Sequence, residues 1–194
     1  MIDYLIKYFD NYVALEEEER GFIRGNISVR EVLKDEILLS EGEVSTEFYF
    51  IIKGCIRLFY TVDVEEKTAF FYTENMFVSS YESFTKQTPS KHYLQAIEPT
   101  KVATISFDVA YRLIDQFPKF EFLARVMMEE ELIVYQEIIS SFVTLNAEQR
   151  YLKLLSSNKS LLQRIPQYQL ATFLGVTPET LSRIRKRVSS KPIS

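Results

Sequence analysis

Two short helical patterns meet at a single glycine near the C-terminus, and this arrangement constrains the fold more than any other feature of the chain. Leu170, Ala171 and Leu174 would lie on one face of a first helix. Gly175 follows, where a tight turn between two helices needs a positive φ angle. The apolar positions of the second helix recur at intervals of three and four residues, at Leu181, Ile184 and Val188. Residues 167–188 therefore predict a pair of packed helices.

The start of the second helix carries its own signals. Thr177 supplies a capping hydroxyl, Pro178 suits the first helical position, and Glu179 places a carboxylate in the first turn. Ala171 is small where the two helices would cross closely. Apolar spacing alone would fit an ordinary amphipathic hairpin with a solvated basic face equally well. The small residue, the glycine and the cap together favour a helix-turn-helix.

The outer face of the second helix would present guanidinium groups, hydroxyls and one carboxylate to solvent. These groups read base edges in a major groove and bind phosphates. The residues predicted to contact DNA are Thr177, Pro178, Glu179, Thr180, Arg183, Lys186 and Arg187.

The distribution of charge supports this interpretation, although the chain as a whole is acidic. The net charge is −4. From Ala147 onward, nine basic residues face two acids, a net +7, which leaves −11 on the first 146 residues. Such asymmetry is typical of an acidic sensing domain joined to a basic nucleic-acid module.

Composition excludes several other classes of protein. Hydrophobic residues make up 46% of the chain, which indicates a globular protein. No segment reaches the roughly 18 to 20 apolar residues of a membrane span, and the N-terminus does not resemble a signal peptide. The single cysteine, Cys55, excludes an internal disulfide and a four-cysteine iron–sulfur cluster, and is expected to be a small buried residue on a strand. We therefore expect a cytoplasmic protein without a membrane partner.

The order of patterns along the chain predicts an α+β protein. Residues 1–25 are expected to be helical, with residues 16–19 on a solvated face. From Ile27 to about Phe107 the apolar period changes to two, and turn signals separate short β-branched and aromatic runs. The runs are residues 37–39, 48–52, 55–60, 68–72, 93–96 and 101–106. Many short strands at this spacing indicate an all-β roll or jelly roll.

A short helix around Val109 and Leu113, interrupted by Pro118, precedes a long helix over about residues 119–143. A second apolar stripe runs along this long helix, so both sides need to be covered. One side can pack on the roll, and the other fits the same helix of a second subunit, although a buried helix within a monomer remains the alternative. The predicted dimer seam has a 3.5-residue repeat and consists of Met128, Leu132, Tyr135, Ile139 and Phe142. Another helix, over residues 147–156, leads through a Ser-rich loop into the helix-turn-helix.

This order of roll, long helix and helix-turn-helix resembles the cyclic-AMP receptor and fumarate–nitrate reduction regulator (Crp/Fnr) family of bacterial transcription factors. The resemblance rests on EGEVSTEFYFIIKGCIRLFY in the roll, on NAEQRYLKLL, and on LATFLGVTPETLSRIRKRV in the tail. It implies a cyclic-nucleotide-binding-like β-roll over residues 1–117, a dimerisation helix over 118–145 and a winged-helix-like DNA-binding domain over 146–194. Implied partners are double-stranded DNA, a second copy of the chain and, for an activator, RNA polymerase.

The nucleotide cassette of the family corresponds to residues 77–96, and this sequence departs from it. Ser79 and Ser80 stand where nucleotide binders have Gly and Glu, and Ser90 and Lys91 stand where they have Arg and a small hydroxyl residue. A serine cannot replace a bidentate, charge-assisted fork, although Lys91 or His92 could hold an anion as a point charge. We therefore expect no cyclic-AMP cofactor, and either an unknown effector or none.

The resemblance also implies roles for individual residues of the tail. Glu179 would accept from a cytosine amino group and Arg183 would bind a guanine, which agrees with side-chain geometry. Thr177, Lys186 and Arg187 would contact phosphates. Pro178 replaces an arginine that reads bases in some members, so the sequence read there should differ.

Two other classes were weighed. An enzyme on a cupin-type roll would need several His and carboxylate ligands for a metal, and the sequence has one histidine, His92, and no nucleophile motif or P-loop. We expect neither a metal site nor catalysis. The other alternative is a cyclic-nucleotide-binding-like signalling module that acts through protein contacts.

Overall fold

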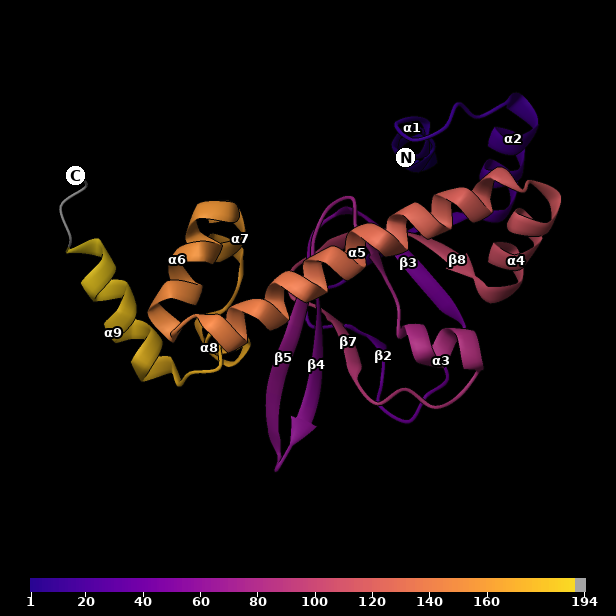
Figure 1. The fold of residues 1–194 in the computed structure, drawn as a ribbon. Coiled ribbons are helices and arrows are strands. Elements are labelled where there is room, and N and C mark those ends of the chain that lie inside the picture. Colours follow the sequence, from indigo (N-terminus) through magenta and orange to yellow (C-terminus); the bar gives the residue numbers. More distant parts are fainter. Residues whose placement is uncertain (191–194) are drawn as a thin grey trace.

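The predicted β-roll consists of two four-stranded antiparallel sheets (Figure 1). The computed structural model describes residues 1–190. The first sheet has the order β1-β8-β3-β6 and the second β2-β7-β4-β5. The strands are β1 (Ser28–Val32), β2 (Ile37–Leu39), β3 (Glu47–Lys53), β4 (Ile56–Val62), β5 (Glu65–Tyr72), β6 (Phe77–Val78), β7 (Tyr93–Ala96) and β8 (Thr100–Ser106).

Six of these strands lie where the alternating patterns predict them, to within three residues at either end. The other two, β1 and β6, were not among the predicted runs. Arg30 and Glu31 interrupt the apolar pattern of β1, and β6 has only two residues. The short helix α3 (Tyr81–Lys86) was also not predicted. Between the sheets lies an apolar core that includes Ile51, Ile56, Leu94 and Val102.

The N-terminal helical region is two helices, α1 (Ile2–Asp10) and α2 (Glu17–Asn26). At the start of α2, the backbone N–H of Glu16 donates to the Glu19 carboxylate at 2.7 Å. The expectation that residues 16–19 form a solvated face is wrong for Glu19, which is buried and ion-paired to Lys119 at 2.8 Å. Both helices share an apolar core with the first sheet and the start of the long helix, through residues such as Phe9 and Phe50.

Helix α4 (Phe107–Gln116) and the long helix α5 (Lys119–Thr144) follow the roll and agree with the predicted bounds. Ser106 caps α4 through its side chain, and α5 begins directly after Pro118. The first turns of α5 bury Phe120 and Leu123, and the helix then crosses the roll towards the C-terminal helices (Figure 1). Within residues 1–190, no helix combines the length and apolarity needed to cross a bilayer.

The C-terminal helices are α6 (Ala147–Ser157), α7 (Lys159–Arg164), α8 (Gln167–Phe173) and α9 (Pro178–Ser189). Helix α7 occupies part of the stretch expected to be a Ser-rich loop, because the Asn158 side chain accepts from the Leu161 N–H and caps it. The α6 cap is Asn146, whose side chain accepts from the Gln149 N–H. Leu162, Leu170 and Leu181 belong to one apolar cluster formed by these helices.

Candidate nucleic-acid interface and effector pocket

The turn between α8 and α9 has the geometry that its sequence predicts. Gly175 has φ +68°, and its N–H donates to Thr172 O at 3.0 Å. The Val176 N–H donates to Ala171 O at 3.0 Å. The Thr177 hydroxyl then accepts from the Thr180 N–H at 3.2 Å and caps α9, with Pro178 in its first turn. Two hydrogen bonds and a cap thus fix the angle at which α9 leaves α8.

Helix α9 buries one side and exposes the other. Leu181 and Ile184 are buried against α8, where Ala171 is fully buried at the crossing. Glu179, Arg183 and Lys186 are exposed on the opposite side. The Arg183 guanidinium lies 3.3 Å from the Thr180 hydroxyl. Hydrogen bonding by its own backbone N–H and by Thr177 lowers the pKa of Glu179, so this group is an acceptor at neutral pH.

The exposed side of α9 borders a hollow of about 390 Å³ that opens to solvent. Pro178, Glu179 and Arg183 line it, together with Gln167 and Ser182. The Gln167 amide donates to Pro178 O at 3.3 Å, which ties the start of α8 to the start of α9. Gln167 and Ser182 were not predicted as site residues. Ser182 could have been predicted from its position on the same helix as Glu179 and Arg183. Gln167 begins α8 and lies near these residues only because the two helices pack together.

Arg150 supports the turn from behind. Its guanidinium donates to Leu174 O at 2.8 Å and to Leu145 O at 2.7 Å, and it lies 4.6 Å from the centre of the Phe142 ring. One side chain therefore joins the end of α5 to the turn of the helix-turn-helix. This basic residue of the tail has a structural role and faces inward.

Other basic residues of the tail are also engaged within the chain. Arg187 pairs with Glu148 at 3.0 Å, Arg185 lies over the Tyr151 ring, and Arg164 binds two acids of the roll. The charge excess of the tail therefore overstates what it can offer to DNA. Of the predicted phosphate contacts, Lys186 is exposed, and Arg187 would have to share its charge with Glu148.

The predicted dimer seam lies mostly on the free side of α5. The exposed fractions are 44% for Met128, 55% for Leu132, 63% for Ile139 and 46% for Phe142. Values this high for apolar side chains along one helix leave an apolar stripe facing solvent in the single chain, on either side of Tyr135.

Tyr135 differs from the other four seam residues, because it packs against the roll. Its ring meets Phe70 at 5.1 Å between centroids, and its hydroxyl donates to Glu131 at 2.5 Å and lies 2.7 Å from the Tyr72 hydroxyl. Burial raises the pKa of Glu131, and burial followed by the neighbouring Tyr135 raises that of Tyr72. Tyr135 therefore joins α5 to the roll within the single chain, and its place in the dimer seam stays a prediction.

The serines of the predicted effector pocket bond to one another. Ser80 and Ser90 are buried, with their hydroxyls 3.0 Å apart, and the Ser90 hydroxyl is also 2.8 Å from His92 O. The Ser79 hydroxyl lies 3.3 Å from that of Ser45. The structure thus brings these residues together, and hydroxyl–hydroxyl contacts join them in pairs.

The two basic residues of the predicted pocket are poorly placed for an anion. Lys91 is exposed and pairs with Glu82 at 2.8 Å. His92 is half-buried with its ring edge-on to Tyr60 at 5.5 Å, and burial lowers its pKa, so it is neutral at pH 7. The segment from Phe77 to Ala96 contains no arginine. This cassette therefore presents no bidentate cation to a cyclic phosphate.

Comparison with known proteins places these features in a family. The profile of the cyclic nucleotide-binding domain matches residues 29–117. A curated anaerobic regulatory protein of Aggregatibacter actinomycetemcomitans is 28% identical over 169 residues, covering 80% of this chain and 65% of the relative. That of Pasteurella multocida is 27% identical over 175 residues, covering 84% and 63%. The chain therefore contains a domain of the cyclic nucleotide-binding family and is similar over 80–84% of its length to anaerobic regulatory proteins. It spans about 63–65% of the length of these two curated relatives.

Solved structures of Crp/Fnr-type regulators have the same fold as this chain. A Crp/Fnr-family transcriptional regulator from Eubacterium rectale superposes with a TM-score of 0.73 at 15% identity, covering 94% of this chain and 88% of that one. The c-di-GMP-responsive global regulator of Xanthomonas campestris gives 0.71 at 17% identity, covering 90% and 92%. The α+β architecture of roll, long helix and helix-turn-helix is therefore confirmed.

Proposed function

We propose that this chain is a sequence-specific, homodimeric DNA-binding transcription regulator of the Crp/Fnr type whose effector domain has lost the usual nucleotide contacts. The observation that carries the proposal is the exposed side of α9. Arg183, Thr180 and Glu179 lie on a capped helix whose angle is fixed by the Gly175 turn and by Arg150. A rigid helix that presents an arginine fork and a carboxylate is suited to reading base edges in a major groove.

The apolar stripe on α5 supports the dimer. Leu132 and Ile139 are more than half exposed, and a second copy of α5 would bury them along the helix. Two recognition helices would then enter successive major grooves roughly 34 Å apart on a near-palindromic site. The proposed parts are an effector roll over residues 1–117, a dimer helix over 118–145 and a DNA-binding part over 146–194, with RNA polymerase as a partner if the protein activates.

The first experiment tests DNA binding with genomic fragments in an electrophoretic shift assay at two salt concentrations. A specific binder retains its preferred fragments as salt rises, whereas nonspecific binding disappears. No shift at either concentration would contradict the proposal and favour a signalling module that acts through protein contacts.

Two substitutions on α9 separate base reading from phosphate binding. Arg183→Ala should cost about 1–3 kcal/mol and relax preference at one base pair of each half-site. Lys186→Ala should instead weaken binding to all sequences about equally and lower the salt slope by about one. If Arg183→Ala keeps the full sequence preference of the parent, the base-reading role is wrong.

A third experiment tests the dimer by sedimentation velocity. Leu132→Glu combined with Ile139→Glu places charges in the proposed seam and should give monomers. Ser140→Glu adds a charge at an exposed polar position of the same helix and should leave the dimer intact. A double variant that sediments like the parent would mean that the interface lies elsewhere.

A further inference from the structure

The C-terminal helices contact the roll directly, in addition to their covalent link through α5. Helix α8 packs along β5, where the Phe71 and Phe173 rings meet edge-on at 5.3 Å between centroids. The Thr68 N–H donates to the Thr172 hydroxyl at 3.2 Å. Cys55, Phe71 and Ile97 of the roll belong to the same apolar cluster as the helices α6–α9. The DNA-binding part is therefore docked on the second sheet.

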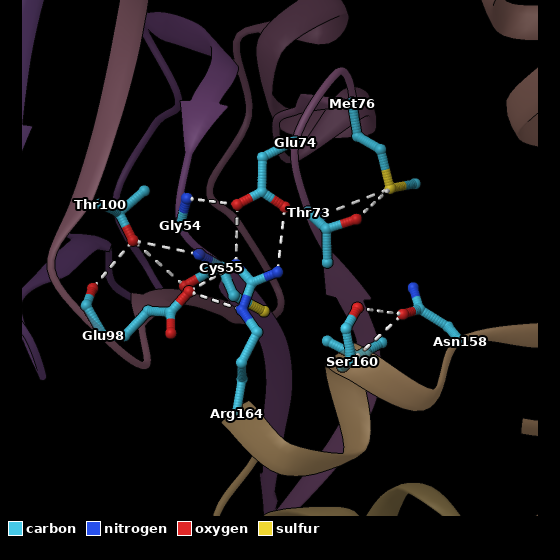
Figure 2. Close-up of polar contacts among 11 residues, drawn as sticks. Gly54, Cys55, Thr73, Glu74, Met76, Glu98, Thr100, Asn158, Ser160 and Arg164 are labelled. Carbon is cyan, nitrogen blue, oxygen red and sulfur yellow. Dashed lines mark hydrogen bonds and ion pairs between the residues drawn. The ribbon is translucent and has the colours of Figure 1, made fainter. Parts of the chain in front are cut away.

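An ionic clasp, formed by Glu74, Glu98 and Arg164, fastens this docking (Figure 2). Arg164, at the end of α7, donates to the two carboxylate oxygens of Glu74 at 3.0 and 2.9 Å. It also donates twice to Glu98, at 3.0 and 2.5 Å. Glu74 is held in turn by the Gly54 N–H at 2.8 Å. Four charge-assisted bonds from one guanidinium fix α7 against two loops of the roll.

The clasp is partly buried, and its hydrogen bonds outweigh the cost of removing the charges from water. The side chains of Arg164, Glu74 and Glu98 are only 25–33% exposed. The hydrogen bonds that Arg164 donates to Glu98 raise the pKa of Arg164; burial opposes this effect, and the bonds to Glu74 add to it. Burial also opposes ionisation of Glu74, but the bonds from Arg164 and Gly54 prevail and lower its pKa. Arg164 and Glu74 are therefore charged at neutral pH.

The two acids lie on either side of the candidate effector cassette. Glu74 is in the loop between β5 and β6, just before Phe77, and Glu98 is in the loop between β7 and β8, just after Ala96. The segment between them contains the serines of the predicted pocket. On the other side of the clasp, α7 leads within two residues into α8, and Leu170 and Ala171 of α8 pack on α9. A change in the cassette can thus reach α9 through the clasp.

We propose that Arg164 is a positioning residue for α9, and that the Glu74–Arg164–Glu98 clasp couples the cassette directly to the recognition helix by a route that does not pass along α5. The docking itself is given by the contacts between α8 and β5 and by the bonds of Arg164 to the two acids. The effect on DNA binding rests on the proposed function, and the experiment below tests the two separately.

The docking is tested without DNA through Cys55, the only cysteine of the sequence. Its thiol is fully buried in the docked cluster, and burial raises its pKa to about 12, so Ellman's reagent can react only when the interface opens. Arg164→Gln should accelerate native-state labelling about tenfold or more. Glu98→Gln, which keeps the Glu74 pair, should label at an intermediate rate.

The matched control is Arg24→Gln. Arg24 also pairs with two carboxylates, Asp3 and Glu17, but on the N-terminal helices. In the Arg24→Gln variant, Cys55 should be labelled at the parental rate. Far-UV circular dichroism establishes that each variant is folded. If Arg164→Gln and Glu98→Gln both label no faster than Arg24→Gln, the clasp does not hold the docking and the proposal is wrong.

Positioning is tested on a duplex selected with the parent protein and on versions with one base pair added or removed between the half-sites. The parent should bind the altered duplexes about tenfold more weakly, and Arg164→Gln should lose most of this discrimination. Faster labelling with unchanged discrimination would overturn the positioning role. If the parent binds no DNA, the proposed function fails, whereas the labelling result still decides the docking.

Discussion

Gly54→Ala should be strongly destabilising, for two reasons that the structure separates. Gly54 has φ +112°, a conformation that costs a residue with a Cβ about 1–3 kcal/mol. The added Cβ would also lie 2.4–2.7 Å from Thr100, including 2.6 Å from its backbone Cα, which a rotamer change cannot relieve. Overpacking of this kind adds about 1–3 kcal/mol. We expect the free energy of unfolding to fall by roughly 2–6 kcal/mol in total, and the midpoint of thermal unfolding to fall by about 10 °C.

The control is Gly42→Ala, which should carry the cost of a positive φ angle but not the cost of overpacking. Gly42 has φ +88°, and nothing lies within 4 Å of the Cβ that would be added. Urea unfolding followed by circular dichroism gives the free energy of unfolding of both variants, and tyrosine fluorescence is a second probe because the chain has 12 Tyr and no Trp. Gly54→Ala should be less stable than Gly42→Ala by about 1–3 kcal/mol. Equal stabilities would refute the close approach of β8 to this turn.

Three further predictions concern single groups. Thr177→Ala removes the cap of α9 and should lower the free energy of unfolding by about 1 kcal/mol. Thr177→Ser keeps a capping hydroxyl and should retain most of this stabilisation. Tyr135→Phe removes the hydroxyl that bonds to both Tyr72 and Glu131, and should lower the free energy of unfolding by about 1–3 kcal/mol in urea titrations. Because the pKa of Glu74 is lowered in the folded state, its stabilisation is present above pH 4.5, the ordinary carboxyl value, and is lost as the pH falls through the lower folded value. Glu74→Gln should therefore flatten the acid side of the stability–pH curve, and an unchanged curve would contradict this.

Local signals in the sequence were enough for the helix-turn-helix and most of the roll. The cap at Thr177, the glycine at 175 and the buried pairs across α8 and α9 act within a few residues of one another, so pattern and structure agree. The longest strands, β3, β4, β5 and β8, contain runs of β-branched and aromatic residues that the sequence shows directly, although buried residues follow one another in them without strict alternation. Strand β1 was missed because charged residues interrupt its pattern, and it is held as an edge strand by its pairing with β8.

Contacts between distant segments could not be predicted in this way. Helical periodicity gives two apolar stripes on α5 but does not say which residues meet the roll, and Tyr135 of the predicted seam packs against it. Glu19 looked like part of an acidic surface run until Lys119 folded onto it. Arg164 was one of nine basic residues in the tail, and nothing near it in sequence indicates its two acidic partners.

The apolar cluster beneath the docked helices has a consequence for protein engineering. Helices α6–α9 complete their core with Cys55, Phe71 and Ile97, which belong to the roll. An excised C-terminal fragment would expose the apolar surface that contacts these three residues. A fragment of this size buries too little apolar surface to tolerate that loss easily. Chimaeras that exchange the C-terminal helices between relatives should therefore also carry a matching β5 surface, because otherwise the apolar faces of the two parts will not fit together.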